Sequence, residues 1–558
     1  MKRALLVLLL LVLAVPAGAQ QTQFTSADTL RGSNGPGRDW WDVTFYDLNV
    51  SVTPEDSTLE GSVSITYRVV GPSGEMQLDL QPPMNLDAVL FGGADRAVRK
   101  DGNAWFVDMP HQETGEVHTV VARFSGTPRL AVNPPWDGGY QWVRDGSGQA
   151  WIATSNQGLG ASIWWPNKDL QSEEPDSQRT AITIPDPMIA VSNGRLMGTT
   201  SNGDGTSTFT WFVSNPINNY SVEVNAGSYA HWNETYEGES GPLTLDFWPL
   251  AENLQAAKNQ WSQVRPMLSC FEHWFGPYPF YEDGYKLIEV PYLGMEHQSG
   301  VTYGNDYANG YRGRDLSGSG HGLKWDFIII HESAHEWWGN NITASDIADN
   351  WVHESFANYS ENIYTECQTG SKEAGEEYVI GTRKNIRNRQ PIVGPYGVNQ
   401  SGADIYDKGG NLLHTIRQLV DDDNSWRQIL RGLNAEFRHK NIAGREVEDY
   451  ITRESGLDLS LVWDQYLRTT MVPVLEWHLG VGEEGSVNEG GDAERSVLSY
   501  RWRNVVHGFD MPIKINLKTG EEIWLQPSEQ WQMLESESGD AIRFEVDPGF
   551  YVRAQPVE

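Results

Sequence analysis

The chain has 558 residues, of which 39% are hydrophobic, and a formal net charge of -34 at pH 7. This length is enough for three or four domains. The strong negative charge repels nucleic acid and anionic membrane surfaces, so it argues against either as a partner. It gives only a weak long-range bias toward cationic ligands, such as peptides with a free amino terminus.

The first residues have the pattern of a secretory signal peptide. Lys2 and Arg3 precede an apolar run over residues 4–15, and small residues up to Ala19 offer a cleavage pattern. The apolar run is too short to span a bilayer. We therefore expect residues 1–19 to be removed near Ala19 and the protein to be exported to the periplasm or the medium. An uncleaved anchor is the alternative, and no later stretch is apolar enough to cross a membrane.

From about residue 40 to residue 245 the pattern predicts strands. Apolar and polar residues alternate over residues 46–52 and 63–69, which is typical of strands with one buried face. Clusters of Gly, Asn, Asp and Pro separate such segments. We predict an N-terminal antiparallel β domain over residues 20–247.

Near residue 250 the pattern becomes helical, which predicts a mainly α domain over residues 248–472. The stop signal for its first helix is at Gly276. Helices are expected over residues 252–274, 358–369, 411–421 and 445–468, and a strand over residues 285–290.

Strands return from about residue 475 and predict a small C-terminal β domain over residues 473–558. Residues 514–517 and 523–525 flank a turn that is typical of a hairpin. The stretch 482–494, rich in Gly and acids, is expected to be a loop or linker. The three regions together predict a multidomain α+β fold.

The two cysteines, Cys270 and Cys367, both lie in stretches expected to be helical. Export permits a disulfide, but two cysteines in so long a chain do not make a disulfide framework. One bridge and two buried thiols are both compatible with the sequence.

The strongest motif lies between His331 and Glu354. It begins with His-Glu-x-x-His, and Glu354 follows His335 by 19 residues. Positions i and i+4 of a helix share a face, so His331 and His335 can bind one metal ion while Glu332 remains free to act on a water. Two histidines and one carboxylate with an open fourth position are typical of catalytic zinc. We predict one Zn²⁺ per chain; a chance motif or two ordinary core histidines is the alternative, which the apolar lead-in at residues 325–330 disfavours.

Residues 291–297 read Pro-Tyr-Leu-Gly-Met-Glu-His. Taken alone, Glu296 is an acid in a turn and more often solvated than functional. Beside a metalloprotease site it could bind the α-amino group of a substrate, which would make the enzyme an exopeptidase. Tyr292 and Met295 are candidates for the first side-chain pocket, which would favour apolar residues.

Together these motifs resemble the zinc aminopeptidases related to aminopeptidase N and leukotriene hydrolase. The family pattern of His-Glu-x-x-His, eighteen residues and Glu is matched at residues 331–354, and WVHESFANY is similar to the typical WLNEGFAxY. The resemblance covers about residues 40–470. It implies a thermolysin-like catalytic domain in a short, secreted bacterial form of the family.

The resemblance also implies roles for individual residues. Gly294, Met295 and Glu296 match the family's exopeptidase motif, so Glu296 would hold the free amino group. Tyr406, in a Tyr-x-Lys-Gly setting, would stabilise the developing oxyanion. Gln157 stands near the place of a substrate-binding glutamine or glutamate.

Two positions depart from the family's exopeptidase motif: Leu293 replaces a glycine and His297 replaces an asparagine. The expected activity is that of a zinc-dependent aminopeptidase that hydrolyses the N-terminal peptide bond of short peptides. A zinc endopeptidase, a lipid epoxide hydrolase on the same scaffold and a secreted, non-catalytic binding protein are the alternatives.

Overall fold

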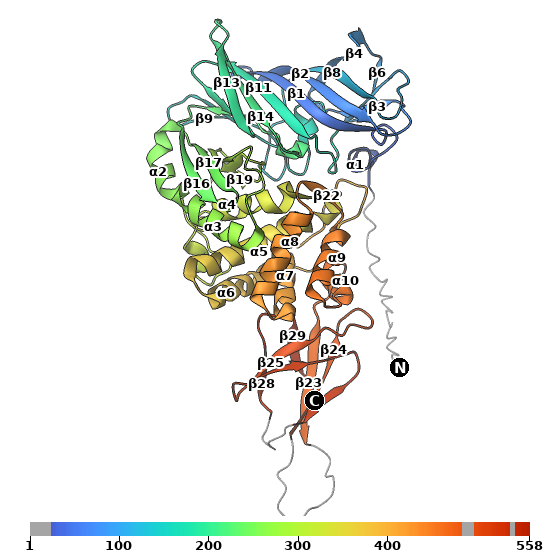
Figure 1. Cartoon of the computed structure of the whole chain (residues 1–558), viewed down its shortest axis with the longest axis vertical. Helices are drawn as coiled ribbons and strands as arrows, with labels where there is room; N and C mark the ends of the chain where they lie inside the picture. The colour runs from blue at the N-terminus through green and yellow to red at the C-terminus, as the bar shows by residue number, and fades with distance from the viewer. Residues whose placement is uncertain (1–23, 482–495, 536–541, 558) are drawn as a thin grey trace, which may run out of the picture.

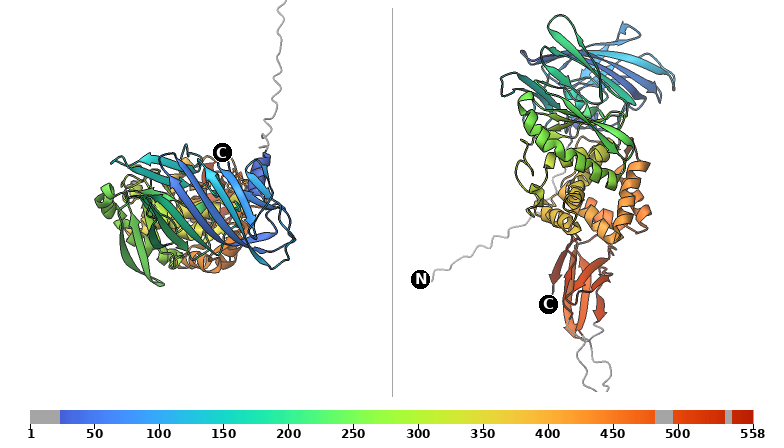
Figure 2. Two further views of the ribbon diagram at one scale, coloured as in Figure 1. Left: turned by 90° about the horizontal axis from the view of Figure 1, so that it is seen from above. Right: turned by 60° about the vertical axis from the view of Figure 1, so that its left-hand side comes forward.

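The computed structural model describes residues 24–481, 496–535 and 542–557. The expected signal peptide and the expected loop or linker at residues 482–494 lie outside the described residues. Figure 1 shows three regions along the longest axis of the molecule: a sheet-rich N-terminal domain, a helical domain and a small β domain. The right-hand view of Figure 2 shows the N-terminal sheets lying over one end of the helical domain, with the small β domain at the other end.

The N-terminal domain is built on an eight-stranded sheet in the order β13-β14-β11-β1-β2-β8-β4-β5. Its strands are β1 (Trp41–Thr53), β2 (Thr58–Val69), β4 (Asn85–Phe91), β5 (Ala94–Asp95), β8 (Val117–Gly126), β11 (Ser177–Pro185), β13 (Arg195–Ser201) and β14 (Thr206–Val213). The two segments with alternating residues lie in β1 and β2, which pair antiparallel. The expectation of a purely antiparallel sheet is wrong at one place, because β1 pairs with β11 in parallel.

Two smaller sheets and a short helix complete this domain. The first sheet holds β3 (Met76–Asp79), β6 (Val98–Asp101) and β7 (Ala104–Val107). The second holds β9 (Gly139–Arg144), β10 (Ala150–Ser155), β12 (Ile189–Val191) and β15 (Asn225–Gly227). Helix α1 spans Ser26–Gly32.

A five-stranded sheet joins the N-terminal domain to the helical one. It is formed by β16 (Trp232–Gly238), β17 (Gly241–Trp248), β18 (Tyr285–Glu289), β20 (Val301–Tyr303) and β19 (Gly294–Met295), in that order. The expected domain boundary at residues 247–248 falls inside this sheet, since β17 pairs in parallel with β18. Hydrogen bonding across the sheet, which the local sequence pattern does not reveal, places β16 and β17 with the helical domain.

The helices of the middle domain are α2 (Leu254–Gln260), α3 (Val264–Phe275), α4 (Phe327–Ala334), α5 (Trp351–Thr369), α6 (Lys372–Thr382), α7 (Asp407–Val420), α8 (Asp423–Glu436), α9 (Gly444–Ser455) and α10 (Ser460–Leu467). A short parallel pair, β21 (Ile342–Ala344) and β22 (Lys440–Ile442), lies among them. The single helix expected over residues 445–468 is in fact α9 and α10. Gly456 has φ +69° after α9, the left-handed conformation that ends helices.

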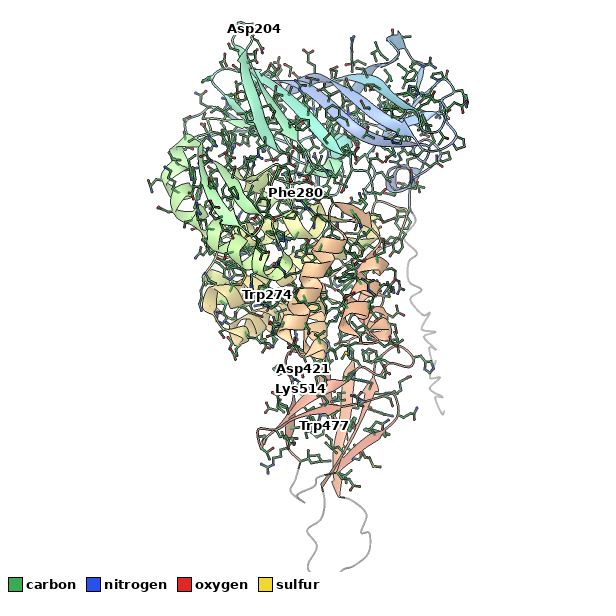
Figure 3. The ribbon with its side chains drawn as sticks, viewed as in Figure 1. Asp204, Trp274, Phe280, Asp421, Trp477 and Lys514 are labelled. Atoms are coloured by element: carbon green, nitrogen blue, oxygen red, sulfur yellow. A yellow bond between two sulfur atoms is a disulfide. The ribbon has the colours of Figure 1, made fainter. Side chains whose placement is uncertain are left out.

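The C-terminal β domain packs directly onto the helices. Its strands are β23 (Val474–Val481), β24 (Ser496–Arg503), β25 (Ile513–Leu517), β26 (Glu522–Leu525), β27 (Gln532–Glu535), β28 (Phe544–Val546) and β29 (Arg553–Pro556). The predicted hairpin is formed by β25 and β26. Lys514 Nζ lies 2.7 Å from Asp421 Oδ1 at the junction, where Figure 3 shows both side chains. One continuous apolar core runs from the helices into this domain.

Cys270 and Cys367 form a disulfide, which resolves the choice that the sequence left open. The bond joins α3 to α5, the helix that carries Glu354. No helix in the described part of the chain has the length and apolar character that a membrane crossing requires.

Candidate metal centre

Helix α4 begins at a side-chain cap. Asp326 Oδ1 accepts hydrogen bonds from the backbone N–H groups of Ile328, at 3.1 Å, and Ile329, at 3.4 Å. Such a cap satisfies amides that a helix leaves free at its first turn. His331 lies in α4, and His335 follows its last residue while retaining helical angles (φ -63°, ψ -18°). Both imidazoles therefore lie on one helix face.

The chain turns sharply after His335. A short π-type turn spans Glu336–Asn340 and contains Gly339 at φ +124°. Residues other than glycine rarely adopt this backbone conformation. Helix α4 ends before this turn, at Ala334. The turn leads into β21 and then to α5, which brings Glu354 to the histidines.

Three side chains converge as zinc ligands would. His331 Nε2 lies 3.6 Å from Glu354 Oε2, and His335 Nε2 lies 3.4 Å from the same oxygen. Tetrahedral zinc with bonds of about 2.0–2.1 Å separates neighbouring ligand atoms by about 3.3–3.4 Å. Glu354 Oε2 is buried, lies near both nitrogens and has no hydrogen-bond partner among the described residues. These residues therefore fit a zinc ion.

The outer nitrogens of the two histidines are held as well. Nδ1 of His331 lies 2.8 Å from Glu361 Oε1, and Nδ1 of His335 lies 2.8 Å from the carbonyl oxygen of Trp338. Because these acceptors require protons on Nδ1, the Nε2 lone pairs face the centre. Glu361 is not among the residues predicted from the sequence. It follows Glu354 by seven residues in α5 and thus lies on the same helix face. This spacing is the feature of the sequence that could have identified it.

The electrostatics of the site shift the pKa values of Glu332 and Glu354 in opposite directions. Burial raises the pKa of Glu332 to about 7, and the nearby charge of Glu296 adds to this increase. Burial alone would also raise the pKa of Glu354, but the adjacent His335 and His331 outweigh it and lower that pKa below its usual range. Glu354 is therefore an anionic ligand, whereas Glu332 can exchange a proton near neutral pH; a bound cation would lower its pKa.

Glu296 lies beside the metal ligands, directly after a short strand. Its side chain is buried, and carboxylate oxygens of Glu296 and Glu332 lie within 4.8 Å of each other and of a His335 nitrogen. Gln157 arrives from the loop after β10 in the N-terminal domain. Its Nε2 donates to Glu296 Oε1 at 3.3 Å and to Glu354 Oε1 at 3.4 Å. The amide thus links the two carboxylates.

The strand β19 approaches α4 closely because Gly294 has no side chain. A Cβ atom at Gly294 would lie 2.6 Å from Ile328 Cγ2 and 3.3 Å from Glu332 Cγ. Side chains that follow each other in a strand point to opposite faces. Met295 accordingly points away from α4, into a small apolar cluster with Tyr292 and three other buried residues.

Met295 and Tyr292 therefore do not line the cavity at the metal site, unlike the expectation from sequence. The cavity has a volume of about 250 Å³. Beside the six polar residues already described (Gln157, Glu296, His331, Glu332, His335 and Glu354), it is lined by Pro135, Trp136, Leu293, Gly294, Tyr311, Leu316, Phe327, Ile328, Asn358, Glu361, Tyr406 and Asp407.

Tyr406 immediately precedes α7, and its ring centroid lies 6.0 Å from that of His331. Gly409 allows α7 to approach α5 here, because a Cβ atom would overlap the Ser355 side chain. The pKa of the Tyr406 phenol is raised well above its usual value by desolvation and by the nearby Glu354, although 36% of the residue's surface is exposed. The hydroxyl therefore remains a neutral hydrogen-bond donor.

Part of the chain is similar to known peptidases. Residues 263–466 match the family model of the Peptidase family M1 domain. Aminopeptidase N of Streptomyces lividans is 24% identical over 80% of this chain and 52% of its own length. Aminopeptidase B of Rattus norvegicus is 23% identical over 71% of this chain and 62% of its own. Aminopeptidase N of Lactococcus lactis is 28% identical over 26% of this chain and 19% of its own.

The matched regions thus span between 19% and 62% of these relatives' own lengths. Among solved structures, a mutant M1 zinc metallopeptidase of Deinococcus radiodurans bound to a Tyr-Ser-Ala substrate superimposes with a TM-score of 0.66 at 20% identity. That match covers 77% of this chain and 95% of the other. It shows that the two chains share a fold.

Proposed function

We propose that this protein is a zinc-dependent aminopeptidase that hydrolyses the N-terminal peptide bond of short peptides. The observation that carries the proposal is the buried Glu296 carboxylate beside the His331, His335 and Glu354 triad. A buried carboxylate is costly to keep charged without a cation, and within the site a substrate's α-ammonium group is the natural partner. A zinc endopeptidase needs no such group.

When bound, zinc supplies a Lewis acid that polarises a carbonyl and lowers the pKa of a coordinated water. Glu332 takes a proton from the attacking water and returns it to the leaving amine. Tyr406 donates a hydrogen bond to the oxygen of the reacting carbonyl as negative charge develops there.

Glu296 and Gln157 position the substrate. The Glu296 carboxylate accepts from the free ammonium group, and Gln157, already 3.3 Å from Glu296 Oε1, limits where that group can sit. Holding the amine in this way places the first carbonyl, and no later one, at the triad. This accounts for cleavage after one residue.

The test compares two matched substrates, leucinamide and N-acetyl-leucinamide, with and without a chelator. We expect hydrolysis of the free amine only, loss of activity with the chelator, and recovery on adding zinc with one zinc per chain by metal analysis. Glu296→Ala should lose most of the activity on leucinamide while keeping its zinc.

The opposite results point to different functions. Cleavage of the acetylated substrate at equal rate would favour a zinc endopeptidase. Hydrolysis of a lipid epoxide but not of leucinamide would favour an epoxide hydrolase. A zinc-loaded protein that hydrolyses none of these compounds would favour a secreted binding protein.

We also propose that the protein is exported and cleaved near Ala19. Support comes from the signal-like residues 1–19 and from the Cys270–Cys367 disulfide, since disulfides persist mainly in oxidising compartments. Cell fractionation and N-terminal sequencing test this; a cytoplasmic protein that begins at Met1 would contradict it.

A further inference from the structure

A segment without regular structure leads to Tyr406. Residues 386–405, here called the connecting segment, contain neither helix nor strand, and Tyr406 follows them at the start of α7. A group that stabilises a developing charge has to be held within about 0.5 Å of its working position. Since the connecting segment has no helix or sheet hydrogen bonds of its own, other parts of the chain must supply the contacts that fix it.

The two ends of the connecting segment are joined by Asp404. Its carboxylate accepts hydrogen bonds from the backbone N–H groups of Arg387, at 3.0 Å, and Asn388, at 2.6 Å. Asn388 and Asp404 have φ values of +49° and +53°, a left-handed conformation that is uncommon in residues other than glycine and that surrounding contacts have to maintain. The backbone two residues before Tyr406 is therefore fixed to Asn388.

The C-terminal β domain supplies the contact that holds the Asn388 side chain. Tyr551 lies between β28 and β29 and is buried, and its hydroxyl accepts a hydrogen bond from Nδ2 of Asn388 at 3.0 Å. Tyr551 is not among the described residues that line the cavity at the metal centre. Its connection to Tyr406 therefore runs through Asn388 and Asp404.

Tyr551 is itself held on several sides. Its backbone N–H donates to Thr415 Oγ1 in α7 at 3.0 Å, and its carbonyl oxygen accepts from the Tyr466 hydroxyl in α10 at 2.8 Å. Just before it in the chain, the carbonyl oxygens of residues 548 and 549 accept from the Arg383 guanidinium at 2.8 and 3.1 Å. The part of the C-terminal domain that carries Tyr551 is thus fixed to the helical domain at three further places.

We propose that the C-terminal β domain positions the Tyr406 hydroxyl, and that Tyr551 is the positioning residue, acting through Asn388 and Asp404. The inference rests on the proposed aminopeptidase function, which gives Tyr406 its role at the reacting carbonyl. It assigns the C-terminal domain a part in turnover, whereas binding of the substrate's free amino group does not depend on it. The expected signature is therefore a change in kcat at constant KM.

Tyr551→Phe removes only the hydroxyl that holds Asn388. We expect kcat on leucinamide to fall about 2- to 10-fold, the size of one hydrogen bond, while KM and zinc content stay unchanged. Asn388→Gly, which the φ of +49° tolerates, should have a similar effect. Lys514→Met is the matched control, because it breaks a different contact of the same domain with the helices, the one to Asp421, and it should keep the wild-type kcat.

A double-mutant cycle separates positioning from a general loss of structure. In a Tyr406→Phe enzyme, adding Tyr551→Phe should cause no further loss of kcat, because the hydroxyl through which it acts is already absent. An unchanged kcat in Tyr551→Phe, or the same fold loss with and without the Tyr406 hydroxyl, would overturn the proposal.

Hydrogen exchange gives a readout that does not need turnover. Peptides from residues 386–405 should exchange faster in Tyr551→Phe than in the wild type or in Lys514→Met, because the contact that holds Asn388 is lost. Equal exchange in all three proteins would overturn the proposal. Failure of the wild type to hydrolyse leucinamide would instead overturn the aminopeptidase function, and the exchange measurement would still decide whether Tyr551 holds the connecting segment.

Discussion

Replacing Glu361 tests whether the histidine geometry depends on its buried partner. Glu361 Oε1 lies 2.8 Å from His331 Nδ1, and its other oxygen accepts from the Tyr378 hydroxyl at 2.6 Å. The His331 and Glu361 side chains are only 7% and 1% exposed, so bulk solvent does not compete for this contact in the wild type. Glu361→Ala frees the ring to rotate and removes the acceptor that holds the proton on Nδ1.

The magnitude follows from that contact. A hydrogen bond to a charged group contributes about 1.5–3 kcal/mol, and loss of such an outer partner typically weakens metal binding by about 10- to 100-fold. We expect Glu361→Ala to weaken zinc binding by about 100-fold. Glu361→Gln keeps an acceptor but loses the charge, and we expect about a tenfold loss.

Competition with a chelating dye measures the zinc dissociation constant directly. Glu366→Gln is the matched control: Glu366 is another carboxylate of α5 with a largely buried side chain, but it pairs with Arg417. That variant should lose stability and keep the zinc affinity of the wild type. If Glu361→Ala binds zinc as tightly as the wild type does, the outer hydrogen bond does not hold His331 and the reasoning is refuted.

Three further predictions concern turnover, stability and pH. Glu332→Gln should keep zinc, by metal analysis, and lose about 10²–10⁴-fold in kcat, the usual contribution of a general base. Cys270→Ala with Cys367→Ala opens a loop of 97 residues and should lower the free energy of unfolding in urea by about 2–5 kcal/mol. An unchanged kcat or an unchanged urea midpoint would contradict these two predictions. Burial lowers the pKa of Lys286 from its ordinary value of 10.5 to about 8. Below pH 8 the buried charge therefore lowers the free energy of unfolding. This loss of stability disappears as the pH rises from 8 to 10.5 and the folded protein releases the proton. Lys286→Met should remove that pH-dependent gain, which unfolding at several pH values would detect.

Helical periodicity explains how the candidate metal ligands could be identified from the sequence. His331 and His335 share a face through spacing alone, and Glu354 came from a motif that is specific as a whole. Glu361 lies on the face of Glu354, yet one acid among many in an acidic chain is not distinguishable without its contact to His331. The split between α9 and α10 depended on Gly456, a glycine inside an otherwise helical pattern.

Residues from the N-terminal domain were harder to place. Gln157 is separated from Glu354 by 197 positions but lies 3.4 Å from it. Trp136 reaches the same cavity from an adjacent loop. Such contacts depend on how the sheets lie over the helical domain, which local patterns do not encode.

By itself, the sequence determined the features that depend on residues close together in the chain. These are the strands with alternating apolar and polar residues, the helix face of the His-Glu-x-x-His motif and the identity of the candidate zinc ligands. Only the tertiary structure decided the parallel pairing of β1 with β11, the Cys270–Cys367 bond, and the position of Gln157 beside Glu296. The physical reason is distance along the chain. Local backbone geometry repeats within a few residues and can be recognised in a sequence, whereas a contact between distant segments is selected by the packing of the whole molecule.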